Sequence, residues 1–240
     1  MKKFATFVIA LALASATAAM AAGPGPFWVK GDYYCVPGCW GADGGNAMTL
    51  SAGVWTATVT SDQAAGRHEW KAANADWSDS YFPWCNNWVH TSGPGDVVKF
   101  TLDTNVYPDG WLPAQDIVWS DHFAPPGTTF EVIGGAAETG GWGSGVAATL
   151  IGTVWTKTLS IATPGSYEVK FRATGTWDVC NVGREGAGAP CGANLQYTTV
   201  NPNQSVTFEF NQATGRARVT VDNPVPATNR SWGSIKQIYR

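Results

Sequence analysis

The sequence predicts an all-β protein made of two tandem β-sandwich modules. Three observations lead to this prediction. Apolar and polar residues alternate with a period of two along several short segments, glycine and proline mark frequent turns between them, and one pattern returns after about 100 residues. No segment beyond the N-terminal stretch carries a convincing helical stripe, so we expect strands throughout.

The N-terminal stretch has the features of a secretory signal peptide. Two lysines precede an apolar run from Phe4 to Ala14, and small residues with an A-x-A-like site follow. We place the signal peptide at residues 1–21. The alternative is a retained membrane anchor, but the second half of the uncharged run is weakly apolar for a bilayer span. We therefore expect an exported protein, either secreted or held at the cell surface.

The rest of the chain contains two related segments. Gly53–Val59 reads GVWTATV and Thr153–Leu159 reads TVWTKTL, so Trp55 and Trp155 occupy the same frame. A repeat of this length corresponds to a whole small domain rather than to a solenoid unit. The expected divisions are residues 22–124 for the first module, 125–222 for the second and 223–240 for a C-terminal tail.

Alternation also predicts which side chains face the core. In one strand of the second module, Tyr167, Val169 and Phe171 point inward and the charged residues between them point outward. The first module repeats this pattern, with Trp70 inward and Lys71 outward. Because large aromatic residues in alternating frames usually pack in a core, we expect Trp55, Trp70 and Trp155 to be buried.

Composition excludes some partners. The chain has 15 basic and 18 acidic residues, a formal net charge of −3, which argues against nucleic acid or anionic lipid as a ligand. Only 14% of residues are charged, whereas the chain has 13 Trp and 28 Gly. We therefore expect a surface that relies on neutral polar and aromatic groups.

The five cysteines of an exported chain imply disulfides and one unpaired thiol. We expect Cys180 to pair with Cys191, because the two bracket a loop that is longer in the second module than in the first. Cys85 is expected to pair with Cys35 or Cys39, and a short Cys35–Cys39 bridge is the alternative. The C-x₃-C spacing lacks the second pair or histidines of a zinc site, so we expect no metal and no cofactor.

Four motifs occur in both modules in the same order. They are a G-x-W-x-x-x-V strand, an (A/P)-G-x-x-E-x-K strand, a Trp six or seven residues after that Lys, and V-x-F-x-(L/F)-(D/N). This pattern resembles the starch-binding-like modules attached to pullulanases, which are early-set immunoglobulin-like β-sandwiches related to glycogen-binding modules. The resemblance covers both modules, about 200 residues. It implies an immunoglobulin-like fold and an α-glucan ligand.

The resemblance also implies the binding residues. In the glycogen-binding relatives, the glucan contacts a Trp of the first long loop, a Lys on the strand before a turn and a Trp after that turn. By motif position these are Trp40, Lys71 and Trp77 in the first module, and Trp142, Lys170 and Trp177 in the second. An Asn on the following loop also contributes, with Asn86 or Asn87 and Asn181 or Asn194 as the candidates. The turn usually written D-G is Asn74-Ala75-Asp76 in the first module, a departure from the family pattern.

The chemistry of a sugar agrees with these residue types. An indole ring matches the apolar C–H face of a pyranose, and Lys or Asn satisfies its hydroxyl rim. The loop from Trp77 to Trp84 also holds Tyr81 and Phe82, a dense aromatic cluster that is costly on a surface unless it meets a ligand or partner. We therefore add Trp84 to the candidate residues.

No catalytic constellation is present in the sequence. His68 lies in a strand frame, where we expect a packing role, and His90 and His122 have no nearby Ser or Cys motif. The loop acids of the first module have few counterparts in the second. The sequence therefore favours a non-catalytic protein that binds polysaccharide, preferably α-glucan. The alternative is a structural or adhesive surface subunit, without a glycan ligand, that self-associates through an unpaired cysteine or its aromatic loops.

Overall fold

The all-β class is confirmed by the computed structural model. It describes residues 25–36, 38–81, 85–188 and 191–222, and the helix within them is the short 3₁₀ turn η1 (Ala137–Thr139). The predicted signal peptide, the C-terminal tail and Trp84 lie outside the described residues. No helix in the described ranges is long and apolar enough to cross a membrane.

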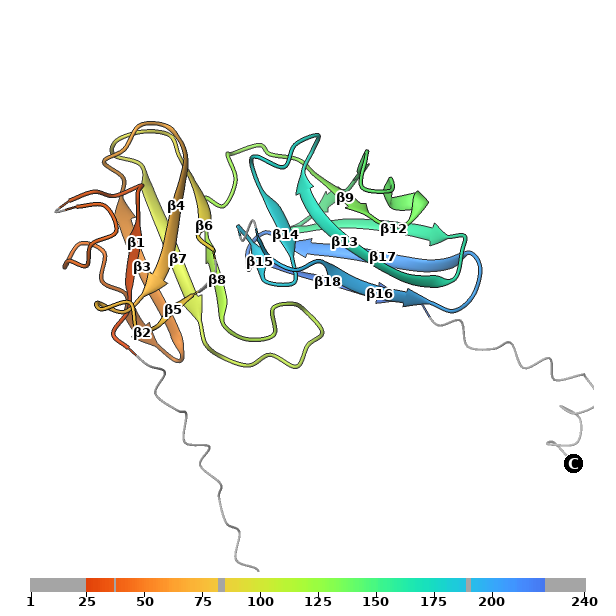
Figure 1. The fold of residues 1–240 in the computed structure, drawn as a ribbon, viewed down its shortest axis with the longest axis horizontal. Helices are drawn as coiled ribbons and strands as arrows, with labels where there is room; N and C mark the ends of the chain where they lie inside the picture. The colour runs from red at the N-terminus through yellow and green to blue at the C-terminus, as the bar shows by residue number, and fades with distance from the viewer. Residues whose placement is uncertain (1–24, 37, 82–84, 189–190, 223–240) are drawn as a thin grey trace, which may run out of the picture.

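In the first half of the molecule, the described residues before β9 (Phe130–Gly134) form two antiparallel sheets around one core (Figure 1). One sheet has the order β1-β4-β5, with β6 also paired to β4, and the other has the order β2-β3-β7-β8. The strands are β1 (Trp28–Gly31), β2 (Thr49–Ser51), β3 (Val54–Thr60), β4 (Gly66–Ala73), β5 (Ser80–Tyr81), β6 (Asn87–Thr91), β7 (Val97–Asp103) and β8 (Ile117–Ser120).

The second half has the same kind of sandwich. Its first sheet has the order β10-β9-β13-β14-β15, with β16 also paired to β13, and its second sheet has the order β11-β12-β17-β18. The strands are β9 (Phe130–Gly134), β10 (Val146–Ala147), β11 (Thr149–Ile151), β12 (Val154–Ile161), β13 (Gly165–Ala173), β14 (Asn181–Gly183), β15 (Gly186–Ala187), β16 (Leu195–Thr199), β17 (Gln204–Asn211) and β18 (Arg216–Val221).

Corresponding residues of the two halves pair in the same register. Trp55 lies opposite Leu102 in the first half, and Trp155 lies opposite Phe210 in the second. The core expectation for the strand tryptophans is confirmed, because Trp55, Trp70 and Trp155 are all buried. Each half therefore closes its two sheets over aromatic residues that alternate with outward polar ones.

The two halves are docked against each other rather than joined by a free spacer. Phe123, Trp119 and Leu112 pack against the core of the second half, and Leu112 exchanges backbone hydrogen bonds of 2.7 and 2.8 Å with Ala217 on β18. The second half also covers the edge of β6. The Trp88 amide donates to the Gly188 carbonyl at 2.8 Å, so an exposed strand edge is closed by the second half.

The disulfides differ from the expected pairing. Cys35 bonds to Cys39, which is the alternative considered above, and Cys85 bonds to Cys191 across the junction. The expected Cys180–Cys191 bridge is wrong, and so is a bridge from Cys85 to Cys35 or Cys39. Cys180 is completely buried in the core of the second half, and the docking of β6 brings Cys85 to Cys191 instead. Disulfides are typical of proteins that mature in an oxidising compartment, in agreement with export.

Peptide mapping without reduction should recover the Cys35–Cys39 and Cys85–Cys191 links. Burial raises the pKa of Cys180 to about 12, so its thiol stays protonated and shielded in the folded protein. A maleimide should therefore label Cys180 only after denaturation. A peptide that joins Cys180 to Cys191 would contradict the assignment.

His90 adds a titrating group to the junction. Its Nε2 lies 2.7 Å from the Val179 carbonyl oxygen. Burial lowers the pKa of His90 below the ordinary 6.5; the hydrogen bond to Val179 opposes this shift, and the charges of Arg67 and His68 add to it. Because the unfolded chain binds this proton more readily, the folded state loses stability as the pH falls below 6.5 toward the folded pKa.

The melting temperature should therefore fall between about pH 7.5 and 5.5 more steeply in the wild type than in His90→Gln. Glutamine keeps an N–H donor for Val179 but does not titrate, which makes it a matched control. Parallel pH profiles for the two proteins would show that His90 is not the group responsible.

Candidate functional site

Each half carries a pair of neighbouring tryptophans at its surface. In the first half the ring centroids of Trp40 and Trp77 are 6.1 Å apart with an interplanar angle of 39°. In the second half Trp142 and Trp177 are 6.5 Å apart at 33°. Three of the rings are well exposed, with 42% for Trp77, 37% for Trp142 and 38% for Trp177, and Trp40 is partly exposed. The structure thus brings together the four tryptophans that the sequence selected, two in each half.

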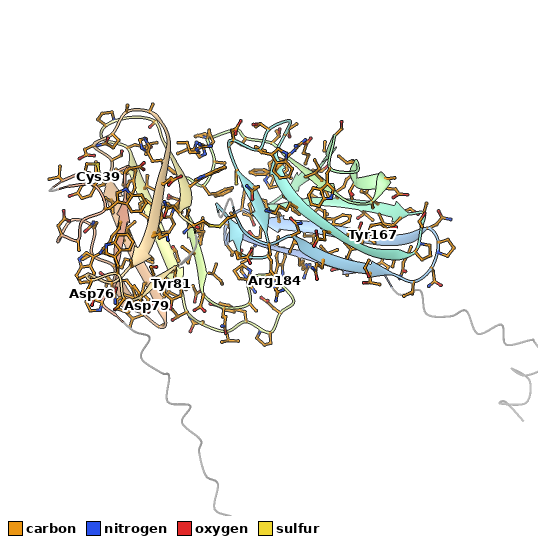
Figure 2. The ribbon with its side chains drawn as sticks, in the orientation of Figure 1. Cys39, Asp76, Asp79, Tyr81, Tyr167 and Arg184 are labelled. Atoms are coloured by element: carbon orange, nitrogen blue, oxygen red, sulfur yellow. A yellow bond between two sulfur atoms is a disulfide. The ribbon has the colours of Figure 1, made fainter. Side chains whose placement is uncertain are left out.

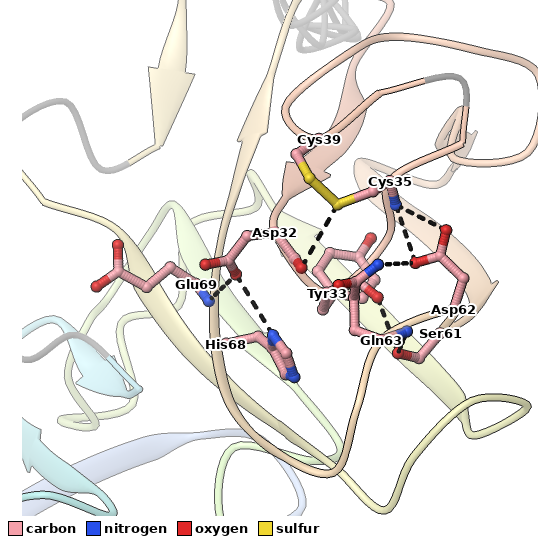
Figure 3. Close-up of a disulfide and its surroundings, with 9 residues drawn as sticks. All are labelled: Asp32, Tyr33, Cys35, Cys39, Ser61, Asp62, Gln63, His68 and Glu69. Atoms are coloured by element: carbon pink, nitrogen blue, oxygen red, sulfur yellow. Dashed lines mark hydrogen bonds and ion pairs between the residues drawn. A yellow bond between two sulfur atoms is a disulfide. The ribbon is translucent and has the colours of Figure 1, made fainter.

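The loop that presents Trp40 is fixed on both sides. The Cys35–Cys39 disulfide immediately precedes it, and the Cys35 amide donates to both carboxylate oxygens of Asp62 at 3.0 and 3.1 Å (Figure 3). The Trp40 amide itself donates to the carbonyl of Gly31 at the end of β1. These bonds hold the residue where the chain leaves the sheet.

The loop that presents Trp77 is stabilised by its own polar side chains. The Asn74 side chain donates to the Ser78 hydroxyl at 2.6 Å and accepts the Asp79 amide at 3.1 Å. Beneath it, the buried Lys30 ammonium donates to the Ala75 carbonyl at 2.9 Å and lies 4.3 Å from the centroid of the Trp77 ring. A cation at this distance favours one ring orientation and leaves the rest of the indole open.

The second half reaches the same arrangement with different residues. The Trp142 amide donates to the Gly134 carbonyl at the end of β9, as Trp40 does to Gly31. Here the cation near the second ring is Arg172, whose guanidinium lies 4.7 Å from the Trp177 centroid. Arg172 is held in turn by Glu131 at 2.6 Å, and both side chains are buried.

Backbone strain is concentrated at these tryptophans. Trp40, Trp77 and Trp142 have φ values of 64°, 64° and 67°, in the left-handed region that large side chains rarely adopt. They are three of the six non-glycine residues with positive φ in the described part of the chain. Such strain persists only where the surrounding structure enforces it, and it is found most often at functional sites.

The two predicted lysines are not surface residues. Lys71 and Lys170 lie on the outward side of β4 and β13, but their exposures are only 9% and 8%. Burial lowers the pKa of both, and Lys170 donates to Asn181 Oδ1 at 3.3 Å. The expectation of exposed lysines is wrong, because alternation identifies the sheet face and not what covers it.

Of the four candidate asparagines, two bond to a glutamate on the neighbouring strand and two are buried. Asn86 donates to Glu69 at 2.6 Å in the first half, and Asn194 donates to Glu168 at 2.8 Å in the second. Glu69 and Glu168 are corresponding residues of β4 and β13, so Asn86 and Asn194 occupy matching places. Asn87 and Asn181 are buried instead.

Sequence reasoning missed the residues that support the rings. Lys30, Arg172 and Glu131 belong to no shared motif, because each half uses a different cation from a different strand. Alternation could have identified Arg172, because it lies two residues after Lys170 and therefore on the same face of β13. Burial of these charges depends on loop placement, which the strand pattern does not contain.

No family model matches the chain, and no curated protein matches it. Among solved structures, the chain is similar to SusF from Bacteroides thetaiotaomicron, with 14% sequence identity and a TM-score of 0.32. The match covers 84% of this chain and 49% of SusF, so the chain spans about half the length of that protein. A likeness of this degree carries no argument about a ligand.

Replacing Glu131 with Gln should destabilise the second half strongly. The substitution leaves the buried Arg172 guanidinium without its counter-charge, a loss of about 3–5 kcal/mol when one partner of a buried pair is removed. Urea unfolding followed by tryptophan fluorescence would measure it.

Glu209→Gln is the matched control for Glu131→Gln. Glu209 pairs with Arg218 in a more exposed position, so its loss should cost less than about 1 kcal/mol. Equal effects of the two substitutions would contradict the view that Glu131 supports the ring of Trp177 from a buried position.

Proposed function

We propose that this protein binds polysaccharide without catalysing a reaction, and that its preferred ligand is an α-glucan. The observation that carries the proposal is the recurrence of one geometry. Both halves present two tilted indoles at corresponding surface positions, three of them well exposed and Trp40 partly so, although the loops that hold them differ in sequence.

Leaving indole rings exposed at these positions costs free energy. Each large aromatic ring left in water forgoes about 1.5–3 kcal/mol of burial free energy, and strained backbone adds to that cost. A pyranose ring recovers part of this loss by placing its C–H face on an indole, and polar groups around the ring can satisfy its hydroxyls. The Asn86–Glu69 and Asn194–Glu168 pairs are polar groups at matching places on the sheets from which the tryptophan loops start.

The tilt of the rings favours one class of polysaccharide. Interplanar angles of 39° and 33° make each pair a bent surface rather than a flat one. Chains of α-1,4-linked glucose coil, whereas β-1,4-linked chains run nearly straight. A bent pair of rings can therefore contact neighbouring sugars of an α-glucan more evenly than those of a straight chain.

Two carboxylates near the pairs, Asp76 and Glu131, have structural partners. Asp76 accepts the amide and hydroxyl of Ser78 within the Trp77 loop, and Glu131 is bound to Arg172. Glycoside hydrolysis needs two carboxyl groups free to face one glycosidic bond. The roles of these acids support a binding rather than a hydrolytic function.

The structural or adhesive alternative now rests on the exposed aromatic rings alone. The unpaired cysteine is Cys180, which is completely buried, so it offers no thiol for a bond between molecules. Exposed rings could still contact another copy of the protein, and the experiment below distinguishes the two functions.

Affinity electrophoresis in gels that contain amylopectin, glycogen, xylan or β-glucan tests the proposal. Migration should be retarded by amylopectin and glycogen. Trp77→Ala and Trp177→Ala should each weaken binding by at least about tenfold at the affected site, and the double variant should migrate as in an empty gel.

Trp111→Ala is the control, because Trp111 stacks on Arg218 of β18, which lies in a sheet that carries neither pair, and its loss should leave retardation unchanged. The proposal fails if no gel retards the wild type. Light scattering that rises with protein concentration in the same preparation would then favour the structural alternative.

A further inference from the structure

The loop that follows Trp177 rests on the first half of the molecule. Arg67 Nη1 donates to the Asp178 carbonyl at 2.7 Å, and His90 Nε2 lies 2.7 Å from the Val179 carbonyl. Two side chains of the first half therefore hold two successive backbone carbonyls directly after the ring of Trp177. A hydrogen bond from a charged donor such as Arg67 is among the stronger ones in proteins.

Arg67 also contacts an additional aromatic ring, that of Trp88. Its guanidinium lies 4.3 Å from the centroid of the Trp88 ring, on the strand next to its own. Trp88 is partly exposed, and its amide is fixed by the Gly188 carbonyl of the second half. A single guanidinium thus lies between the ring of Trp88 and the loop of Trp177.

The second half lacks these residues at corresponding positions. Arg67 faces His90 across β4 and β6, whereas the matching residues across β13 and β16 are Ser166 and Thr198. These two hydroxyls bond to each other at 2.9 Å. Trp88 likewise corresponds to Gln196. The residues Arg67, Trp88 and His90 are therefore a feature of the junction and not of the sandwich.

Among the described residues, none from outside the first half gives such support to the first pair of tryptophans. Cys39 and Asp76, the neighbours of Trp40 and Trp77, lie at the end of the first half that faces away from the second (Figure 2). The loop of Trp77 is held by Asn74 and Lys30 from the same half. The two pairs, although alike in geometry, thus differ in what surrounds them.

We propose that the Trp142–Trp177 pair is a composite binding site completed by the first half. Arg67 and His90 act as positioning residues that fix the Trp177 loop, and the Arg67–Trp88 stack extends the aromatic surface across the junction. This inference rests on the proposed glycan-binding function. It implies that the second site accommodates a longer stretch of α-glucan than the Trp142–Trp177 pair would hold without the first half.

The test uses the full chain with Trp40→Ala and Trp77→Ala, so that only the second site can bind. Into this parent, Arg67→Ser, Trp88→Gln and His90→Thr are introduced singly, each giving the residue that the second half uses. The Cys85–Cys191 disulfide keeps the halves joined in every variant. Arg218→Ala is the control, since Arg218 also stacks on a tryptophan, Trp111, but away from Trp177.

Two measurements are made on each protein. Calorimetric titration with short and long α-1,4-linked glucose oligosaccharides should show that Arg67→Ser weakens binding of the long ligand by about tenfold and of the short one less. Hydrogen exchange should show faster exchange of the amides of residues 176–180 in Arg67→Ser and His90→Thr. Trp88→Gln should affect the long ligand without changing this exchange, and the control should change neither.

Unchanged exchange in Arg67→Ser and His90→Thr would overturn the proposal, whatever the sugar data show. Unchanged affinity for the long ligand in Arg67→Ser and Trp88→Gln would overturn it as well. If the parent and the wild type bind no oligosaccharide, the glycan function fails. Faster exchange would then still support the composite construction of the loop, so the two failures can be told apart.

Discussion

An indole ring stays at a protein surface only when something prevents it from folding onto apolar neighbours. In this molecule the restraint comes from the backbone and from a cation near one ring of each pair. Trp40, Trp77 and Trp142 are held at positive φ, and Lys30 and Arg172 fix the orientation of Trp77 and Trp177. The sandwiches below provide rigid strand ends from which these loops start, and a site built on rigid elements keeps its geometry better than a free loop.

The polar residues beneath the rings are part of the same restraint. A buried ammonium or guanidinium is costly unless hydrogen bonds and counter-charges surround it. Lys30 meets this requirement with a carbonyl of the Trp77 loop, and Arg172 meets it with Glu131. The charges consequently tie the loops to the sheets, and the two halves reach one surface geometry through different polar residues.

Strand patterns predicted the architecture because burial of one sheet face is a local property of the sequence. The buried Trp55, Trp70 and Trp155 were identified in this way. The disulfide that joins Cys85 to Cys191 was not, because it depends on how the halves dock, and no local pattern contains that contact. The burial of Lys71 and Lys170 was missed for a similar reason. Alternation gave the face of the sheet on which each lysine lies, but it could not show that this face is covered.

Docking also changes what a tandem arrangement can do. Two sites on a flexible linker gain avidity over a range of ligand shapes, whereas two sites at a fixed spacing gain it only from a ligand that matches that spacing. Here Cys85–Cys191, the Leu112–Ala217 bridge and the packing of Phe123 fix the halves together. The spacing between the two tryptophan pairs is therefore a property of the folded chain. Under the proposed function, a branched or coiled polysaccharide that presents segments at this spacing would engage both pairs at once, and a short oligosaccharide would engage only one.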